Sequence, residues 1–176
     1  MTPLTLSSLT AAIAAAGFAM AAVNDDPADY PYGDAPLTSL SYDEAGVHAE
    51  RVFERSDRDG DGTLNVDEFA ALSIVTAELA HLNGFIVIEH EDGVKTVPLS
   101  AAGEGALSAS EHVRINAVAR HVFYNFAGPD RALDAEEYAR LQSAHFKASD
   151  LNANGDLNRR ELSVYARRQA FVPIGA

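Results

Sequence analysis

Residues 57–68 read DRDGDGTLNVDE, and residues 150–161 read DLNANGDLNRRE. Both stretches place side-chain oxygens at positions 1, 3, 5, 9 and 12 and a glycine at position 6. A hard cation such as Ca²⁺ takes about six to eight oxygen ligands, so a short loop must aim alternate side chains at one point and then reverse its direction. Gly62 and Gly155 permit the reversal, because a positive φ angle costs glycine little. The spacing therefore predicts two calcium-binding loops.

Apolar residues frame the two loops in the same way, with Leu64 and Leu157 at position 8 and Phe53 and Phe146 four residues before each loop. With these flanks the chain resembles the EF-hand family of helix-loop-helix calcium proteins, over about residues 43–75 and 134–170. The resemblance implies two bound Ca²⁺ ions. The ligands it implies are Asp57, Asp59, Asp61, Thr63 through its carbonyl, Asn65 and Glu68 in the first loop, and Asp150, Asn152, Asn154, Asp156 through its carbonyl, Asn158 and Glu161 in the second. The alternative is two polar turns that are acidic only because turns favour Asp, Asn and Gly.

A third, incomplete copy of the unit lies between the two loops. Its residues repeat those of the first copy at an offset of 70 before the loop and 69 after it, with Val122-Phe123, Leu133 and Glu136-Glu137-Tyr138-Ala139 matching Val52-Phe53, Leu64 and Asp67-Glu68-Phe69-Ala70. One residue is missing within this loop, and Arg131 falls where the turn glycine belongs. We expect the copy to keep its helices without binding metal, and to pair with the intact unit that follows, Leu133 opposite Leu157. An ordinary helix-turn-helix connection is the alternative.

Residues 1–21 have the composition of a secretory signal peptide. Met1 to Ala22 contain no charged side chain, and Ala19-Met20-Ala21 offers the small residues that a signal peptidase reads. The usual Lys or Arg of the n-region is absent, and the alternative is an Ala-rich first helix packed on the domain. We predict a periplasmic or secreted protein. No membrane span is expected in the mature chain, because the apolar run is shorter than the ~20 residues that a spanning helix needs.

The rest of the chain is predicted to be mostly α, an EF-hand array of two intact hands and one degenerate hand with an inserted β-hairpin. An acidic, Pro-rich linker is expected over residues 22–40, and the first hand over 41–83, beginning at the capping box of Ser41 and Glu44. The β-hairpin is expected over 84–100, where two β-rich runs flank Asp92-Gly93. Four consecutive apolar residues from Phe85 predict burial of both hairpin faces. The degenerate and second intact hands follow over 108–176.

Composition narrows the classes of partner and activity. Asp and Glu number 26 against 13 Lys and Arg, a formal net charge of −13, which argues against nucleic acid and anionic membrane surfaces as partners. The six histidines show no zinc spacing, and the chain has no nucleophile elbow, no phosphate-binding glycine loop and no cysteine, so we do not expect an enzyme. Leu64 is left without a partner strand. Either the hairpin supplies an edge, or two protomers form a homodimer through their first hands.

The favoured function is that of an exported calcium-binding protein, in which the ion stabilises the fold or is buffered. A calcium-dependent interaction module that grips a protein partner is the alternative. The mature chain lacks the methionine-rich groove of calmodulin-type sensors, because Met1 and Met20 both lie in the predicted leader. A lanthanide carrier ranks third, because the bacterial lanthanide-binding relatives carry proline at loop position 2, where this chain has Arg58 and Leu151.

Overall fold

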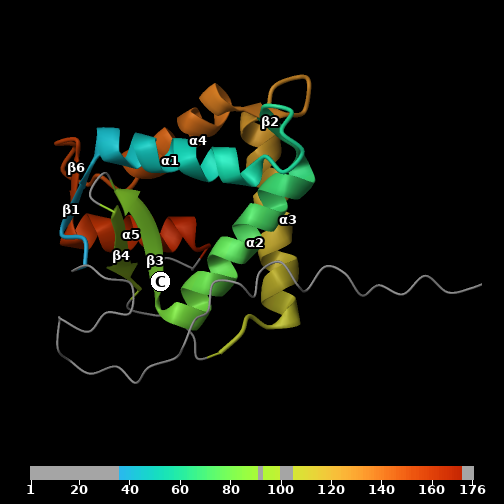
Figure 1. The fold of residues 1–176 in the computed structure, drawn as a ribbon. Coiled ribbons are helices and arrows are strands. Elements are labelled where there is room, and N and C mark those ends of the chain that lie inside the picture. Colours follow the sequence, from blue (N-terminus) through green and yellow to red (C-terminus); the bar gives the residue numbers. More distant parts are fainter. Residues whose placement is uncertain (1–35, 91–92, 100–104, 172–176) are drawn as a thin grey trace, which may run out of the picture.

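The computed structural model describes residues 36–90, 93–99 and 105–171. The predicted signal peptide and most of the predicted linker lie outside these residues. The described chain is mostly helical, as expected, and has five helices and three two-stranded antiparallel sheets (Figure 1). In chain order the elements are β1 (Ser39–Ser41), α1 (Tyr42–Ser56), β2 (Thr63–Leu64), α2 (Val66–Asn83), β3 (Phe85–His90), β4 (Gly93–Pro98), α3 (Ala109–Phe126), β5 (Leu133–Asp134), α4 (Ala135–Lys147), β6 (Asp156–Asn158) and α5 (Arg159–Gln169). None of the described helices is long and apolar enough to cross a membrane.

Local sequence determines where the helices begin and end. Each of the five begins at a capping box, in which the N-cap side chain accepts a hydrogen bond from the N3 amide and the N3 glutamate accepts one from the N-cap amide. The box predicted at Ser41 is confirmed, and Asn65 and Asn158 form two more at position 9 of the loops. Helix α2 ends at Gly84, whose φ of 72° gives a left-handed cap. Loop position 9 therefore serves the helix as well as the loop.

The short strands pair differently from the prediction. Leu64 in β2 pairs with Leu133 in β5, and Leu157 in β6 pairs with Leu40 in β1. The incomplete loop thus joins the first intact loop rather than the one that follows it. The linker predicted over 22–40 is wrong at its C-terminal end, because residues 39–41 form β1 and the N–H of Leu37 donates to the carbonyl of Thr96 at 2.9 Å. Because Leu64 is paired within the chain, the reason for expecting a homodimer through the first hand disappears.

The pairing reveals an internal repeat without gaps. Helices α1 and α4 are equivalent, since each runs from a short strand to a twelve-residue loop. Near its C-terminal end each carries a serine, Ser56 or Ser149, whose hydroxyl donates to the carbonyl four residues earlier, at 2.7 and 2.8 Å. A constant offset of 93 residues relates Leu40 to Leu133, Asp57 to Asp150, Leu64 to Leu157 and Glu68 to Glu161. In this repeat β1 is equivalent to β5 and β2 is equivalent to β6, so the two sheets β1–β6 and β2–β5 are equivalent.

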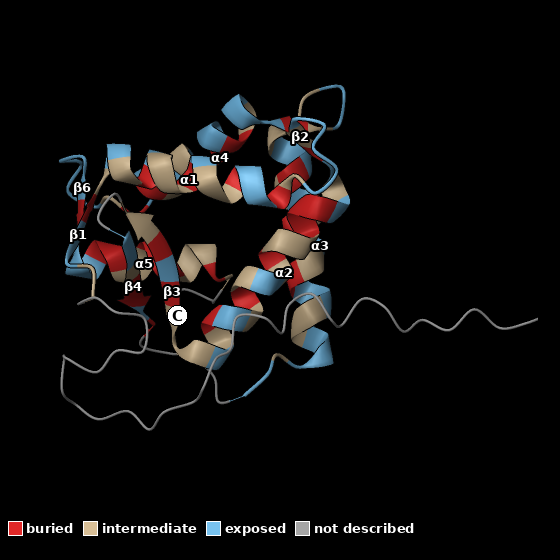
Figure 2. Ribbon diagram, viewed as in Figure 1, coloured by how far each residue is buried: buried red, intermediate tan, exposed pale blue. Residues whose placement is uncertain are grey.

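Two apolar clusters lie at the two ends of the α1–α4 pair (Figure 2). One surrounds the β1–β6 sheet and includes residues of α5 and the hairpin, and the other surrounds the β2–β5 sheet and includes residues of α2 and α3. The predicted hairpin is confirmed, with Phe85 paired to Pro98 and His90 to Gly93. One face is packed more fully than the other. Ile86 and Ile88 are buried on the first face, while on the second Val87 is 42% exposed and its cross-strand partner Thr96 is buried.

Candidate metal centre

The first loop joins α1 to α2 and folds around its own carboxylates. The Oδ1 atom of Asp57 accepts hydrogen bonds from the N–H groups of Gly60 at 2.8 Å and Asp61 at 3.2 Å, and Oδ2 accepts one from Gly62 at 2.9 Å. The Oδ1 atom of Asp61 accepts bonds from the N–H and the hydroxyl of Thr63, both at 2.8 Å. Backbone amides therefore hold the aspartates of positions 1 and 5 in the orientation that the spacing predicts.

Three carboxylates of this loop converge. Oxygens of Asp57, Asp59 and Asp61 lie within 4.8 Å of one another. The pKa of Asp59 is raised by desolvation in the loop and by repulsion from Asp61, Glu68 and Asp57, although a hydrogen bond from the Asp61 amide opposes the shift. A cation among these oxygens would offset the repulsion between the carboxylates.

Glu68 at position 12 ties the two ends of the first loop together. Its Oε1 atom accepts a hydrogen bond from the N–H of Arg58 at 2.9 Å, and its Oε2 atom accepts one from the N–H of Asn65 at 3.0 Å. The side-chain oxygen of Asn65 accepts bonds from the first-turn amides of Asp67 and Glu68. Glu68 is only 9% exposed. This buried carboxylate is held by amides at positions 2 and 9 and acts electrostatically on Asp59, but it is not one of the three carboxylates whose oxygens converge within 4.8 Å.

The second loop, between α4 and α5, repeats this arrangement with fewer charges. Asp150 accepts bonds from the N–H groups of Asn154 at 3.2 Å and Gly155 at 2.9 Å, and Asn152 accepts one from Asn154 at 3.0 Å. The side chain of Asn154 in turn accepts a bond from the N–H of Asp156 at 2.9 Å. The amides of positions 5, 6 and 7 therefore wrap the second loop as they wrap the first, but neutral oxygens stand at positions 3 and 5.

Glu161 closes the second loop as Glu68 closes the first. It is 2% exposed and accepts bonds from the N–H groups of Leu151 at 2.9 Å, Asn152 at 3.2 Å and Asn158 at 3.0 Å. Asn158 caps α5 through the amides of Arg160 and Glu161. All twelve residues predicted from the sequence thus belong to two matching loops, with positions 7 in the strands β2 and β6.

Backbone conformation confirms the role expected of the position-6 glycines. Gly62 and Gly155 have φ values of 85° and 84°. Position 4 is also left-handed in both loops, with φ of 71° at Gly60 and 56° at Ala153. The second loop therefore places an alanine where the first uses glycine, in a region that favours glycine.

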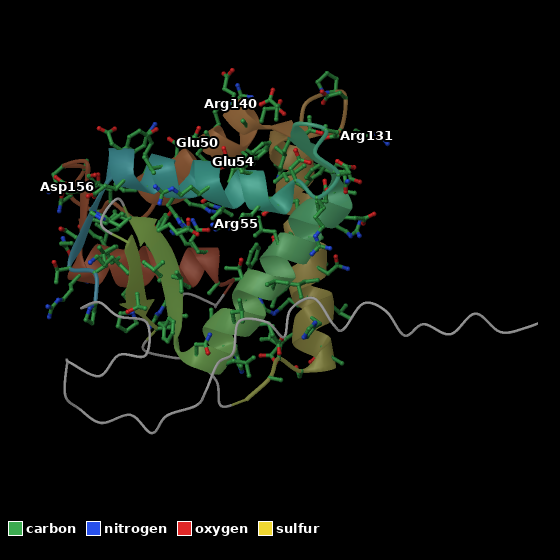
Figure 3. The ribbon with its side chains drawn as sticks, in the orientation of Figure 1. Glu50, Glu54, Arg55, Arg131, Arg140 and Asp156 are labelled. Carbon is green, nitrogen blue, oxygen red and sulfur yellow. The ribbon has the colours of Figure 1, made fainter. Side chains whose placement is uncertain are left out.

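The third loop keeps the turn and loses most of the side-chain oxygens. Arg131 has a φ of 61°, so it adopts the conformation of the missing glycine. A Cβ added to Gly128 would lie 3.1 Å from Oε1 of Glu137, and the same Oε1 atom lies 3.4 Å from a guanidinium nitrogen of Arg140. Arg131 lies at the opposite end of the α1–α4 pair from Asp156 (Figure 3). The Cβ added to Gly128 would also lie 3.3 Å from Oδ1 of Asp130, so Arg140 and a single aspartate stand near the Glu137 carboxylate, where the first loop has three converging aspartates.

A remnant of a fourth loop precedes α1, and it was not predicted from the sequence. Leu40, Ser41 and Glu44 stand 24 residues before Leu64, Asn65 and Glu68, and so correspond to positions 8, 9 and 12. The Glu44 carboxylate accepts a bond from the N–H of Ser41 at 2.7 Å and lies 2.6 Å from Nε2 of His90. The signal that would have found this remnant is the ungapped match of Leu40, Ser41 and Glu44 to Leu133, Asp134 and Glu137.

No family model matches the chain, and neither a curated protein nor a solved structure matches it.

Proposed function

We propose that the protein binds two calcium ions through loops of the EF-hand type. The observation that carries this proposal is the convergence of the Asp57, Asp59 and Asp61 oxygens within 4.8 Å, inside a web of backbone amides that the second loop repeats. Bound calcium would supply the positive charge that balances these carboxylates. The protein supplies their orientation, the buried closing glutamate and the turn at position 6.

The chemistry of the ligands favours a hard divalent ion. Every candidate ligand is an oxygen, from carboxylates, amides or backbone carbonyls, and the chain has no cysteine. Oxygen-only sites suit Ca²⁺ and Mg²⁺, whereas thiolate and imidazole ligands suit the softer transition metals. A flexible loop of many oxygens fits the larger ion better, because Mg²⁺ demands near-octahedral geometry.

The two loops should differ in affinity. Asp57, Asp59, Asp61 and Glu68 give the first loop four carboxylates, whereas Asp150 and Glu161 give the second loop only two side-chain carboxylate ligands. More negative charge attracts a divalent ion more strongly, and we propose that this outweighs the repulsion in the empty loop. The first site is therefore the tighter one.

Isothermal titration calorimetry of single substitutions tests both statements. Glu68→Gln should abolish the tighter binding step and leave the weaker one, and Glu161→Gln should do the reverse. Glu54→Gln, an exposed glutamate of α1 outside the loops, is the matched control and should keep both steps. Loss of the tighter step in Glu161→Gln would reverse the order, and absence of any binding heat in the unmodified protein at millimolar Ca²⁺ would refute the proposal.

We propose further that the protein is exported and that calcium acts on it as a structural stabiliser or is buffered by it. The signal-like composition of residues 1–21 supports export, and calcium outside the cell is abundant enough to keep such loops filled. A calcium-dependent interaction module is the second candidate. It is favoured by one observation, that Glu68 and Phe69 line a large cavity beside the first loop. A dye that reports exposed apolar surface separates the two, since only the module requires that surface to change with calcium.

A further inference from the structure

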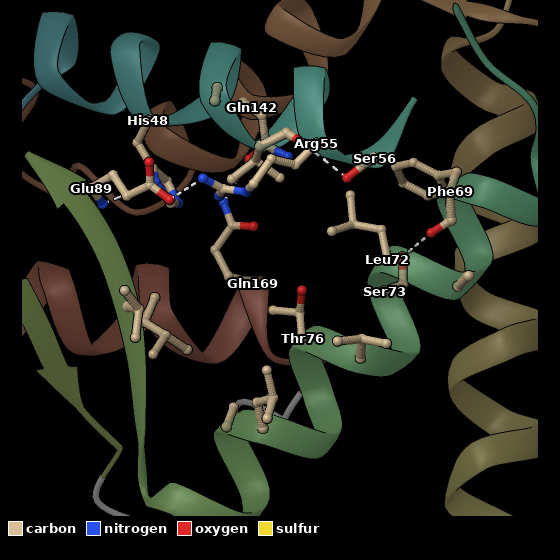
Figure 4. A pocket seen from close by; sticks show the side chains of 18 of the residues that line it. His48, Arg55, Ser56, Phe69, Leu72, Ser73, Thr76, Glu89, Gln142 and Gln169 are labelled. Carbon is tan, nitrogen blue, oxygen red and sulfur yellow. Dashed lines mark hydrogen bonds and ion pairs between the residues drawn. The ribbon is translucent and has the colours of Figure 1, made fainter. Parts of the chain in front are cut away.

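A cavity of about 520 Å³ lies between α1, α2, α4, α5 and the β3–β4 hairpin (Figure 4). Its volume falls within the ~300–1,000 Å³ of ordinary small-molecule sites. Protein interiors rarely leave voids larger than a water molecule, and apolar cavities of only ~150 Å³ stay dry and take up benzene. A cavity of this size is therefore a candidate binding site in its own right.

Polar side chains gather at the end of the cavity beneath α1 (Figure 4). Arg55 forms an ion pair with Glu89, and the backbone N–H of Glu89 donates to Nδ1 of His48 at 3.1 Å. Nε2 of Gln169 donates to Oε1 of Gln142 at 2.6 Å. An amide side chain has two donor hydrogens and two acceptor lone pairs, so this pair retains capacity for one further polar group.

The other walls of the cavity are mainly apolar, with Ser73, Thr76 and Asn83 of α2 as polar exceptions. Helix α2 contributes Leu72, Val75 and Leu79, and the hairpin contributes Val87 and Val94. Four of these, Val75, Leu79, Val87 and Val94, are 37–42% exposed, although the sequence of β3 predicted burial of both hairpin faces. Apolar surface that the fold leaves uncovered around a cavity is typical of a ligand site.

The charges in the wall cancel. Arg55 and Arg58 stand against Glu68 and Glu89, and burial holds the pKa of His48 and of His145 down to about 4, so both imidazoles are neutral at pH 7. Nδ1 of His145 is buried without a hydrogen-bond partner. A wall without net charge that contains an unsatisfied ring nitrogen suits a ligand that is uncharged and carries a polar group.

We propose that this cavity binds a small uncharged amphiphile, with an apolar body between α2 and the hairpin and a hydroxyl or carbonyl head at the Arg55–Gln169 end. The apolar walls supply the affinity through burial, and the polar end fixes the orientation. The balanced wall selects against charged heads, because burying a charge without a partner of opposite sign is costly. The cavity shares Arg58 and Glu68 with the first loop, but the proposed ligand contacts α2, the hairpin and the Arg55–Gln169 end, so its binding is tested apart from calcium binding.

Displacement of the uncharged dye Nile red by three ten-carbon probes tests the proposal with the full-length protein. Decanol should displace the dye at least tenfold more effectively than decanoate or decylammonium. Thr76→Phe, which places a ring in the cavity from α2, should weaken decanol binding by about tenfold, which corresponds to ~1.4 kcal/mol. Val113→Phe is the matched control, because Val113 is 70% exposed on α3 and does not line the cavity.

The exposed Val87→Ser variant guards against misfolding of Thr76→Phe and should also bind decanol less tightly. All titrations are run both in calcium and in EGTA. Decanol binding in both conditions would support the cavity proposal even if calorimetry found no calcium binding. Preference for either charged probe, or equal binding by Thr76→Phe and Val113→Phe, would overturn the proposal. So would dye binding that appears only in a chain shortened after Phe171, because the residues beyond it would then be the occupant.

Discussion

Ala153 offers a direct measure of the strain in the second loop. It holds φ at 56°, whereas the equivalent Gly60 holds φ at 71°. An L-residue in the left-handed region costs roughly 1–2 kcal/mol, and glycine costs roughly 0.5–1 kcal/mol through the greater entropy of the unfolded chain. The difference predicts that Ala153→Gly raises the free energy of unfolding by roughly 0.5–1 kcal/mol.

The first loop supplies the reverse experiment. Gly60→Ala should lower the free energy of unfolding by a similar amount, and a Cβ at this position meets no atom within 4 Å, so the effect is conformational rather than steric. Gly46→Ala is the matched control. It also meets nothing within 4 Å, but it lies inside α1 without a positive φ, so it should stabilise the protein by up to ~1 kcal/mol.

Urea unfolding followed by circular dichroism, in EGTA so that loop occupancy does not contribute, measures all three variants. Thermal melting gives a second estimate, since 1 kcal/mol shifts the melting temperature by roughly 2–4 °C in a chain of this size. The reasoning fails if Ala153→Gly is neutral or destabilising, or if Gly60→Ala and Gly46→Ala change stability in the same direction.

Three further outcomes are expected. Leu40→Ala should lower the free energy of unfolding, measured in urea, by about 2–5 kcal/mol, because Leu40 is 0% exposed. Leu151→Ala, at a residue that is 63% exposed, should change it by no more than about 0.5 kcal/mol. Equal effects would contradict the place of β1 in the core. Burial lowers the pKa of His48 and His145 to about 4 in the folded protein. Their contribution to stability is therefore complete above the unfolded pKa of 6.5 and is lost as the pH falls from 6.5 toward 4. Proton NMR should find neither residue titrating above pH 6, and His48→Gln should flatten the pH profile of stability. Removal of calcium with EGTA should lower the melting temperature, by the equivalent of about 2.7 kcal/mol where calcium stood a hundredfold above its Kd, and an unchanged melting curve would exclude a structural role for the ion.

Local chemistry made much of the fold predictable. The capping box at Ser41 and the hairpin around Gly93 each depend on a few neighbouring residues, and both are confirmed. The twelve loop residues are predictable for the same reason, since a metal loop is defined by spacing within one short segment.

The strand pairing was not predictable in the same way. The two or three residues of each short strand carry no register information beyond one buried leucine, and Leu40, Leu64, Leu133 and Leu157 are chemically interchangeable partners. Proximity in sequence favours pairing of neighbouring loops, and so predicts Leu133 opposite Leu157. Proline and aspartate before residue 36 also masked β1, because their composition is that of a linker while Leu40 belongs to the core.

The strand pairing means that neither half of the described chain, divided at the hairpin turn, contains a complete strand pair. Strand β1 pairs with β6, β2 with β5 and β3 with β4, so a cut at the hairpin turn would leave two fragments, each with three orphaned strand edges. Those edges are complementary to the other half from any copy of the chain. Two chains could therefore form a domain-swapped dimer, in which they exchange their C-terminal halves and rebuild the same sheets.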